Sequence, residues 1–203
     1  LPDQRDTLRS FKDISGPNGL LLVFARTANG CGYCRNQLAE LNLSFDDLAA
    51  RGIGVAAMTS DDTGITREFS ELANLRYPLL ADTGARYIER LGILNTNVEE
   101  HEGGINGGRF AFPGHFLLDA NGVIVDKLFT DDLRHRNSAT DLVFRHYGPG
   151  SASTAVEVRA PEFSVEILLA TYRVQTGQQI AFSARFKVRP GWHLYGTPLP
   201  KGY

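Results

Sequence analysis

Cysteine is scarce in this chain of 203 residues: there are two, Cys31 and Cys34, and they stand three positions apart. Two cysteines cannot form a disulfide-stapled scaffold, and a bridge between them closes too small a loop to stabilise the fold much. A zinc site made of four cysteines is excluded by the same count. What remains is a close cysteine pair that is available for chemistry.

Long hydrophobic runs are also absent. The longest covers residues 20–25, far short of the ~18–20 apolar residues that a membrane-spanning helix needs. No basic segment followed by an apolar core stands at the front, so no signal peptide is visible. Because the chain begins with Leu1 rather than methionine, we interpret it as a processed fragment, and the missing signal says little about compartment.

Neither sign of charge dominates. The net charge is −2, which excludes wholesale electrostatic attraction to nucleic acid or to an anionic membrane. The balance nevertheless changes along the chain: residues 1–150 hold 15 Lys and Arg against 20 Asp and Glu, whereas residues 151–203 hold 6 against 3. Small residues at 148–154 are typical of a linker. We therefore expect a domain over residues 1–148, a linker over 149–155 and a second module over 156–203.

The first part alternates predicted strands and helices. Continuous apolar runs predict strands buried on both faces at Leu20–Ala25 and Ile53–Met58. Apolar residues at steps of three and four predict a helix that ends at Gly52, with Leu38, Leu41, Phe45 and Leu48 on its buried face. The same pattern predicts later helices with apolar residues at Ile65, Phe69, Leu72 and Leu75, at Tyr87, Ile88 and Leu91, and at Leu142, Val143 and Tyr147.

A hairpin is predicted late in the first part. Residues 115–119 and 123–129 are strand-like and flank Ala120-Asn121-Gly122, which is a turn signal. Strands and helices in alternation, followed by a hairpin and a helix, indicate an α/β fold of the mixed-sheet sandwich type. The second part is different: residues 156–158, 163–169 and 180–188 alternate as half-buried strands do, with a turn at 176–177.

The cysteine pair lies at the junction between the first buried strand and the first helix. At a helix N-terminus, Cys31 faces unpaired backbone N–H groups and the positive end of the helix dipole, both of which stabilise a thiolate. Cys34 lies one turn on, within reach of a disulfide. We therefore predict that Cys31 is the attacking thiolate and Cys34 the resolving thiol. Arg26 and Arg35 are candidates for lowering the thiol pKa further, although arginines near a loop are usually solvated.

Three other interpretations of the pair are an inert bridge, half of a metal site and two buried thiols. A metal site needs two further ligands, and the five histidines include no close pair. We therefore predict neither a metal nor another cofactor.

At these residues the chain resembles the thioredoxin-like superfamily, across roughly residues 8–148. Cys31-Gly32-Tyr33-Cys34 has the form of the superfamily's redox motif, and residues 112–122 are similar to its cis-proline segment and following hairpin. The resemblance implies a three-layer sandwich in which Pro113 is cis and shapes substrate access beside the cysteines. It further implies that Gly32, Tyr33 and the backbone of Phe112 contact the substrate.

Within the superfamily, residues 38–92 are most similar to the AhpC/TSA (redoxin) branch, through Gln37–Leu41 and Tyr77–Asp82. That similarity invites a peroxiredoxin-like peroxidase, but two positions depart from the pattern. Ala28 stands where peroxiredoxins place a threonine, and Pro113 stands where they place an arginine. Without those groups a peroxide lacks polarising hydrogen bonds, which are usually worth several kcal/mol.

The chain also departs from thioredoxin proper. Asn29-Gly30 precedes Cys31 in place of a tryptophan, and Phe24 and Ala25 occupy the place of the buried acid on the preceding strand. The proton acceptor for Cys34 is therefore unidentified. The reduction potential is open over the family range of about −270 to −120 mV, and with it the direction of electron flow.

Other polar groups are weaker candidates. His115 is interpreted as a packed side chain rather than a proton relay, and residues 97–102 as a solvated loop rather than a cation site. The glycine-rich residues 103–108 do not fit a phosphate loop. Asp61 or Asp62 is predicted to cap a helix.

The second part resembles the beginning of the amino-terminal β-sandwich of DsbD-type thiol:disulfide interchange proteins. Residues 165–195, and Pro190-Gly191-Trp192-His193 in particular, carry that resemblance. It implies a partial all-β, immunoglobulin-like module for docking, with Trp192 and Tyr195 in its core. It also favours a periplasmic or otherwise extracytoplasmic setting, and a cytoplasmic one is not excluded.

These observations predict a thiol–disulfide oxidoreductase that forms a mixed disulfide at Cys31. Its partners are expected to be protein thiols or disulfides and a redox partner, with no nucleic acid and no membrane-spanning segment in this chain. A peroxiredoxin-like thiol peroxidase is the enzymatic alternative, and a redox-switched docking module is the non-enzymatic one.

Overall fold

The computed structural model describes residues 1–97, 106–132, 136–151, 153–171 and 178–194. Its centre is a mixed sheet of five strands in the order β3-β2-β1-β4-β5. The strands are β1 (Gly19–Phe24), β2 (Ile53–Thr59), β3 (Leu79–Ala81), β4 (Gly114–Leu118) and β5 (Ile124–Phe129). The first three run parallel, and β4 and β5 form an antiparallel hairpin beside β1. The predicted buried strands and the hairpin are confirmed.

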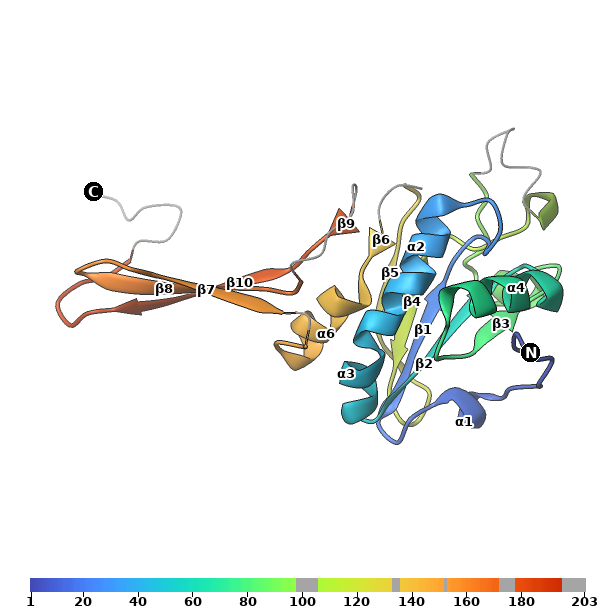
Figure 1. The fold of residues 1–203 in the computed structure, drawn as a ribbon, viewed down its shortest axis with the longest axis horizontal. Coiled ribbons are helices and arrows are strands. Elements are labelled where there is room, and N and C mark those ends of the chain that lie inside the picture. The colour runs from blue at the N-terminus through green and yellow to red at the C-terminus, as the bar shows by residue number, and fades with distance from the viewer. Residues whose placement is uncertain (98–105, 133–135, 152, 172–177, 195–203) are drawn as a thin grey trace.

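Helices cover both faces of this sheet, which makes the predicted three-layer sandwich (Figure 1). One face packs under α2 (Gly32–Glu40), the 3-10 turn η1 (Leu41–Ser44), α3 (Phe45–Ala50), α4 (Thr63–Ala73) and α6 (Ala139–Tyr147). The other face is covered by α5 (Arg86–Arg90) and by the N-terminal segment that contains α1 (Phe11–Ile14). β1 lies in the middle of the sheet, and its side chains enter both cores. The end of this central strand is where the cysteine loop begins.

The helix predicted to run without interruption to Gly52 is broken in two. Residues 41–44 form a 3-10 turn between α2 and α3. Asn42 provides the reason: its amide donates to the carbonyls of Ala73 and Asn74 and accepts from the N–H of Arg76. A side chain that bonds backbone groups elsewhere favours a break in the helix.

Five apolar residues predicted to be buried are exposed: Leu72, Tyr87, Leu91, Tyr147 and Trp192. Leu72 on α4 is 66% exposed, because the buried face of that helix is formed by Thr66, Phe69 and Ser70. Trp192 is 61% exposed, so its predicted place in a core is wrong. It follows the last strand of a three-stranded sheet, and Tyr195 lies outside the described residues.

The C-terminal part forms an antiparallel sheet that extends away from the sandwich (Figure 1). Its strands, in the order β10-β8-β7, are β7 (Thr154–Arg159), β8 (Phe163–Leu169) and β10 (Phe182–Val188). We call this sheet the arm. A short parallel pair, β6 (Arg136–Asn137) with β9 (Gln178–Gln179), joins it to the sandwich. The predicted turn at 176–177 lies outside the described residues, and the limits of the two domains stay a prediction.

Candidate active site at the Cys31–Cys34 disulfide

Cys31 and Cys34 form a disulfide at the N-terminus of α2, with their Cα atoms 5.3 Å apart. Cys31 is the N-cap residue, and its Sγ accepts a hydrogen bond from the N–H of Cys34 at 3.2 Å. This places the sulfur against the unpaired N–H groups of the first helical turn, where a negative charge is stabilised. The junction expected from the sequence is therefore the geometry found, and it suits a low-pKa thiol at Cys31.

The disulfide is buried except along one edge. Cys31 is 5% exposed and Cys34 is fully buried. The two residues between them are exposed: Tyr33 keeps 41% of its surface, and nothing lies within 4 Å of a Cβ built on Gly32. Among the residues that the structure describes, the exposed Gly32 and Tyr33 mark an edge by which a large partner would reach the Cys31 sulfur, whereas Cys34 and Leu38 of α2 are packed in the core.

Arg26 lies against the Cys31 sulfur. Its Nη2 is 3.6 Å from Cys31 Sγ, and the residue is buried on the loop that follows β1. Arg35, the other arginine singled out in the sequence, instead places its guanidinium 5.3 Å from the ring centre of Phe69. Of the two candidates for lowering the thiol pKa, the structure brings only Arg26 to the sulfur.

A second arginine, Arg136 on β6, lies against Cys34. Its Nη2 is 3.8 Å from Cys34 Sγ, and the side chain is 7% exposed. Burial and, to a smaller extent, the nearby positive charge of Arg26 lower the pKa of Arg136 to about 10, against the opposing charge of Asp132. The two arginines thus bring two positive charges to one disulfide. Sequence reasoning missed Arg136 because 102 positions separate it from Cys34 and no motif links them.

The loop that carries Cys31 is pinned by Asp61. This buried carboxylate accepts hydrogen bonds from Thr27 Oγ1 and the N–H of Ala28, both at 2.6 Å, and from Asn106 Nδ2 at 2.8 Å. Asp62, not Asp61, is the predicted cap: its side chain accepts from the N–H of Ile65 at 2.9 Å, at the start of α4. Asp61 is a residue of the site that the sequence reasoning did not assign.

Pro113 is buried immediately before β4. Its neighbour Gly114 pairs with Phe24, the last residue of β1, so the proline lies beside the strand end that leads into the cysteine loop. The N–H of Phe112 donates to the carbonyl of Ile93 at 2.9 Å. Substrate pairing through Phe112 would therefore use its carbonyl. The cis isomer of Pro113 and the substrate contacts of Phe112 stay predictions.

His115 is packed in the core, as expected. It pairs with Val23 in the ladder between β4 and β1, and it is 4% exposed. Burial lowers the pKa of His115 to about 4, in opposition to Asp126, whose Oδ2 is 3.8 Å from His115 Nε2. The imidazole is therefore neutral near pH 7. Its Nε2 and the Oε1 of Gln37 are buried, and both residues line a small cavity between α2, β4 and α6.

The remaining candidates fall outside the site. Residues 98–105, which include most of the acidic loop and half of the glycine-rich stretch, lie outside the described residues. Among the residues that the structure describes, no group of three His, Cys, Asp or Glu is arranged to hold a metal. Within the same residues, no helix is both long and apolar enough to cross a membrane.

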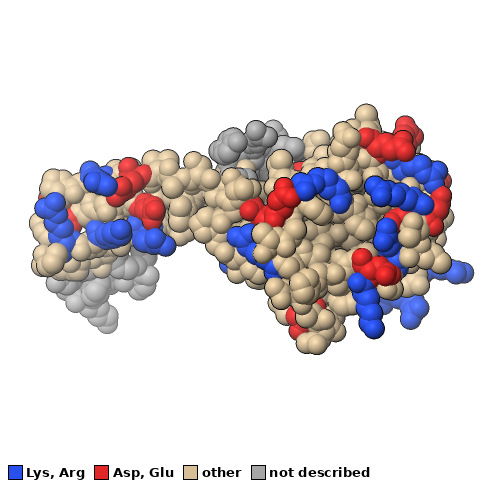
Figure 2. Space-filling model, turned by 60° about the horizontal axis from the view of Figure 1, so that its bottom comes forward, with Lys and Arg blue, Asp and Glu red and all other residues tan. Residues whose placement is uncertain are grey.

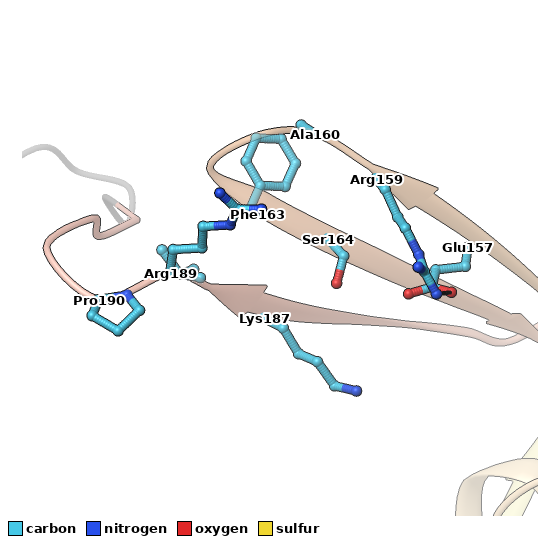
Figure 3. A pocket seen from close by; sticks show the side chains of 9 residues that line it. Glu157, Arg159, Ala160, Phe163, Ser164, Lys187, Arg189 and Pro190 are labelled. Carbon is cyan, nitrogen blue, oxygen red and sulfur yellow. Dashed lines mark hydrogen bonds and ion pairs between the residues drawn. The ribbon is translucent and has the colours of Figure 1, made fainter.

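A cavity of about 440 Å³ lies on the arm, not at the cysteines. Figure 3 shows its side chains on three strands and the adjoining loop, with Arg159, Lys187 and Arg189 among them. Arg159 is already paired with Glu157 at 2.8 Å. Figure 2 shows Lys and Arg gathered at this outer end of the arm, separated from the charged surface of the sandwich by an uncharged stretch.

A three-layer sandwich with a redox-active pair at a strand-to-helix junction defines a thioredoxin-like oxidoreductase. The chain matches the AhpC/TSA family over residues 1–127 and belongs to that family. Comparison with curated proteins found no match.

Solved structures with the same fold include peroxiredoxins. The peroxidoxin BcpB of Mycobacterium tuberculosis is 18% identical, with a TM-score of 0.56 over 65% of this chain and 80% of that one. A PrxQ mutant from Xylella fastidiosa is 16% identical, with a TM-score of 0.54 over 64% and 76%. Peroxiredoxin Q of Xanthomonas campestris is 13% identical, with a TM-score of 0.53 over 64% and 78%. At these identities the likeness concerns the fold.

Proposed function

We propose that this protein is a thiol–disulfide oxidoreductase that exchanges disulfides with other proteins through Cys31. The observation that carries the proposal is the placement of Cys31 Sγ at the N-cap of α2 and 3.6 Å from Arg26 Nη2. Both neighbours stabilise a thiolate, which is the attacking species in disulfide exchange. The exposed Gly32 and Tyr33 leave room beside the sulfur for a polypeptide rather than a small molecule in a closed pocket.

The exchange proceeds in two steps. In the reductive direction, the Cys31 thiolate attacks one sulfur of a substrate disulfide, and the other substrate sulfur leaves as a thiolate and takes up a proton. Cys34 then attacks Cys31 Sγ and releases the second substrate thiol. Two electrons pass to the substrate, and the Cys31–Cys34 disulfide forms. The reverse sequence oxidises a substrate dithiol, and a redox partner restores the starting state in either direction.

Reduction of insulin disulfides, with dithiothreitol as the electron source, tests this proposal. We expect Cys31→Ser to abolish turnover, whereas Cys34→Ser keeps the first step and accumulates a mixed disulfide at Cys31. Arg35→Gln is the control and should keep turnover. Arg35 lies on α2 beside Cys34, but its guanidinium lies over the ring of Phe69. The absence of turnover with amounts of enzyme equal to substrate would overturn the proposal.

A thiol peroxidase is the second candidate, and Arg26 favours it. Pro113 stands where peroxiredoxins carry an arginine, but the guanidinium of Arg26 reaches Cys31 Sγ from another position. The threonine function is not replaced in the same way, since the hydroxyl of Thr27 donates to Asp61. Peroxide consumption by the reduced protein decides between the two: a rate above that of free cysteine, lost in Arg26→Gln, would favour the peroxidase.

A redox-switched docking module is the non-enzymatic alternative. Its support is the arm, whose strands β7 and β10 carry exposed Val156, Val158, Phe182 and Phe186. A change of conformation on oxidation, measured by hydrogen exchange and accompanied by neither activity, would favour it.

We also propose a periplasmic or extracytoplasmic setting, which rests on the resemblance of residues 165–195 to a DsbD-type β-sandwich. Fractionation of the producing cells tests the compartment.

A further inference from the structure

Each sulfur of the disulfide has its own guanidinium. Arg26 Nη2 lies 3.6 Å from Cys31 Sγ, and Arg136 Nη2 lies 3.8 Å from Cys34 Sγ. The two arginines come from different parts of the fold, the loop after β1 and the short strand β6. Both are more than nine-tenths buried, as are the two cysteines. The arrangement is therefore an internal feature of the site and not a surface contact.

The charges in this arrangement suit the reduced state. A disulfide carries no net charge, whereas burial and the neighbouring positive charge of Arg26 both disfavour the charged form of Arg136 and lower its pKa. Reduction can add a thiolate at each sulfur, next to a cation that is already in place. In a poorly hydrated environment such a pair is screened far less than it would be in water. The site is thus complementary to negative charge at Cys34 as well as at Cys31.

Negative charge at Cys34 solves a chemical problem that the sequence leaves open. Cys34 must lose its proton before it can attack the mixed disulfide. The strand β1, which leads to the site, ends at Phe24 and is followed by Ala25, and neither residue is an acid. His115 is neutral near pH 7, and the small cavity that it lines lies between Gln37 and Ser138. A cation in contact with Cys34 Sγ lowers the pKa of the thiol, so that its proton passes to solvent and no side-chain acceptor is needed.

The backbone fixes Arg136 at this position. Arg136 pairs with Gln178 in the parallel β6–β9 ladder, and its Nη1 donates to the carbonyl of Asp132 at 3.4 Å. β9 belongs to the segment that leads into β10 of the arm. The arginine at the resolving cysteine is therefore held by a strand pair that includes the C-terminal part of the chain.

We propose that Arg136 is a catalytic residue of the resolving step, whose guanidinium keeps Cys34 as a thiolate in the reduced protein. The thiolate attacks Cys31 Sγ in the mixed disulfide, the Cys31–Cys34 bond forms, and the substrate sulfur leaves and takes its proton from solvent. This role of Arg136 in the resolving step rests on the exchange reaction proposed above. The charge at Cys34 itself can be measured without any substrate.

The experiment titrates the single thiol of Cys31→Ser by its thiolate absorbance in the ultraviolet. Arg136 faces Cys34 Sγ, and Arg26, Asp132 and Tyr33 are the charged and titratable groups that act on Arg136 in turn. We expect a Cys34 pKa below the ordinary thiol value of about 8.5. Adding Arg136→Gln should raise this pKa by about one to three units, the range for loss of an adjacent opposite charge. Arg136→Lys should restore most of the effect, and Arg35→Gln should change nothing.

The kinetic readout uses the protein with both cysteines. Resolution of a preformed mixed disulfide should slow at least about tenfold near pH 7 in Arg136→Gln, with the rate regained at higher pH. If the Cys34 pKa is the same with Arg136→Gln as with Arg136, and the variant is folded, the inference is overturned while the exchange proposal stays intact. If that variant does not fold, a Cys34 pKa at or above about 8.5 with Arg136 present overturns it equally. Failure of insulin reduction alone contradicts only the function.

Discussion

The hydroxyl of Thr27 donates a 2.6 Å hydrogen bond to the carboxylate of Asp61, and through this contact the loop after β1 is tied to the loop after β2. The same carboxylate accepts from the N–H of Ala28, three residues before Cys31. Asp61 is 1% exposed, so these bonds are made away from water. The position of the reactive sulfur relative to α2 therefore depends on a residue 30 positions away from it in the sequence.

Asp61→Ala should destabilise the protein and slow its chemistry. A buried hydrogen bond to a charged group is worth about 1.5–3 kcal/mol, and Ala28 loses its partner, so we expect a loss of about 3 kcal/mol in urea unfolding. Turnover of disulfides should fall with it, because Cys31 is no longer held. Asp62→Ala is the matched control: it removes an N-cap worth about 1 kcal/mol and should leave turnover unchanged. Equal effects of the two variants on turnover would contradict the role assigned to Asp61.

Stability should fall as the pH falls through the range of His115. The pKa of His115 is lowered from 6.5 to about 4 in the folded protein, so the unfolded chain binds the proton more readily. The contribution of the neutral, buried His115 to the free energy of unfolding is fully present above pH 6.5 and is lost as the pH falls toward 4. At about 1.4 kcal/mol per pKa unit it amounts to roughly 3 kcal/mol.

Urea unfolding of the protein and of His115→Gln, at pH 7 and pH 4.5, measures this contribution. The variant should lose less stability between the two pH values than the parent, because the carboxylates common to both proteins cancel. Parallel losses in the parent and His115→Gln would show that His115 does not titrate as stated.

Tyr77→Phe should weaken the attachment of α2. The buried Tyr77 hydroxyl donates to the carbonyl of Leu38, one helical turn beyond Cys34, and burial raises the Tyr77 pKa. Removing the hydroxyl leaves that bond unmade at a cost of about 1–2 kcal/mol in unfolding free energy. Tyr87→Phe, at a tyrosine that is 47% exposed, should cost close to nothing. A Tyr77→Phe protein as stable as its parent would contradict the prediction.

Asp141→Ala should loosen the junction between the arm and the sandwich. The buried Asp141 side chain on α6 accepts a hydrogen bond from the N–H of Ala181, just before β10. Without this acceptor, the amide of Ala181 should exchange its hydrogen at least about tenfold faster, since each 1.4 kcal/mol of lost protection corresponds to a factor of ten. Amides of the central arm strand, such as that of Ile167, provide the internal control. Unchanged exchange at Ala181 would show that other contacts hold the junction.

Local patterns in the sequence determined much of the fold and the central pair of the site. The apolar runs at 20–25 and 53–58, the turn at 120–122 and the spacing of Cys31 and Cys34 each depend on neighbours in the chain, and each was found as predicted. Apolar strand runs, helix capping and helix periodicity are short-range, so a single sequence carries them. The helix pattern failed at Leu72, Tyr87, Leu91 and Tyr147, where exposure depends on which elements pack nearby, and the core position that the resemblance implied for Trp192 failed as well.

The surroundings of the pair were decided by the tertiary structure. Arg136 reaches Cys34 across 102 positions and Asp61 reaches Ala28 across 33, with no recurrent spacing to mark either contact. Arg26 and Arg35 are equivalent candidates in the sequence, and only the path of the loop after β1 separates them. The sequence thus placed a redox pair at a helix N-terminus. The packing of distant segments then set its electrostatics, because charge acts through space and not along the chain.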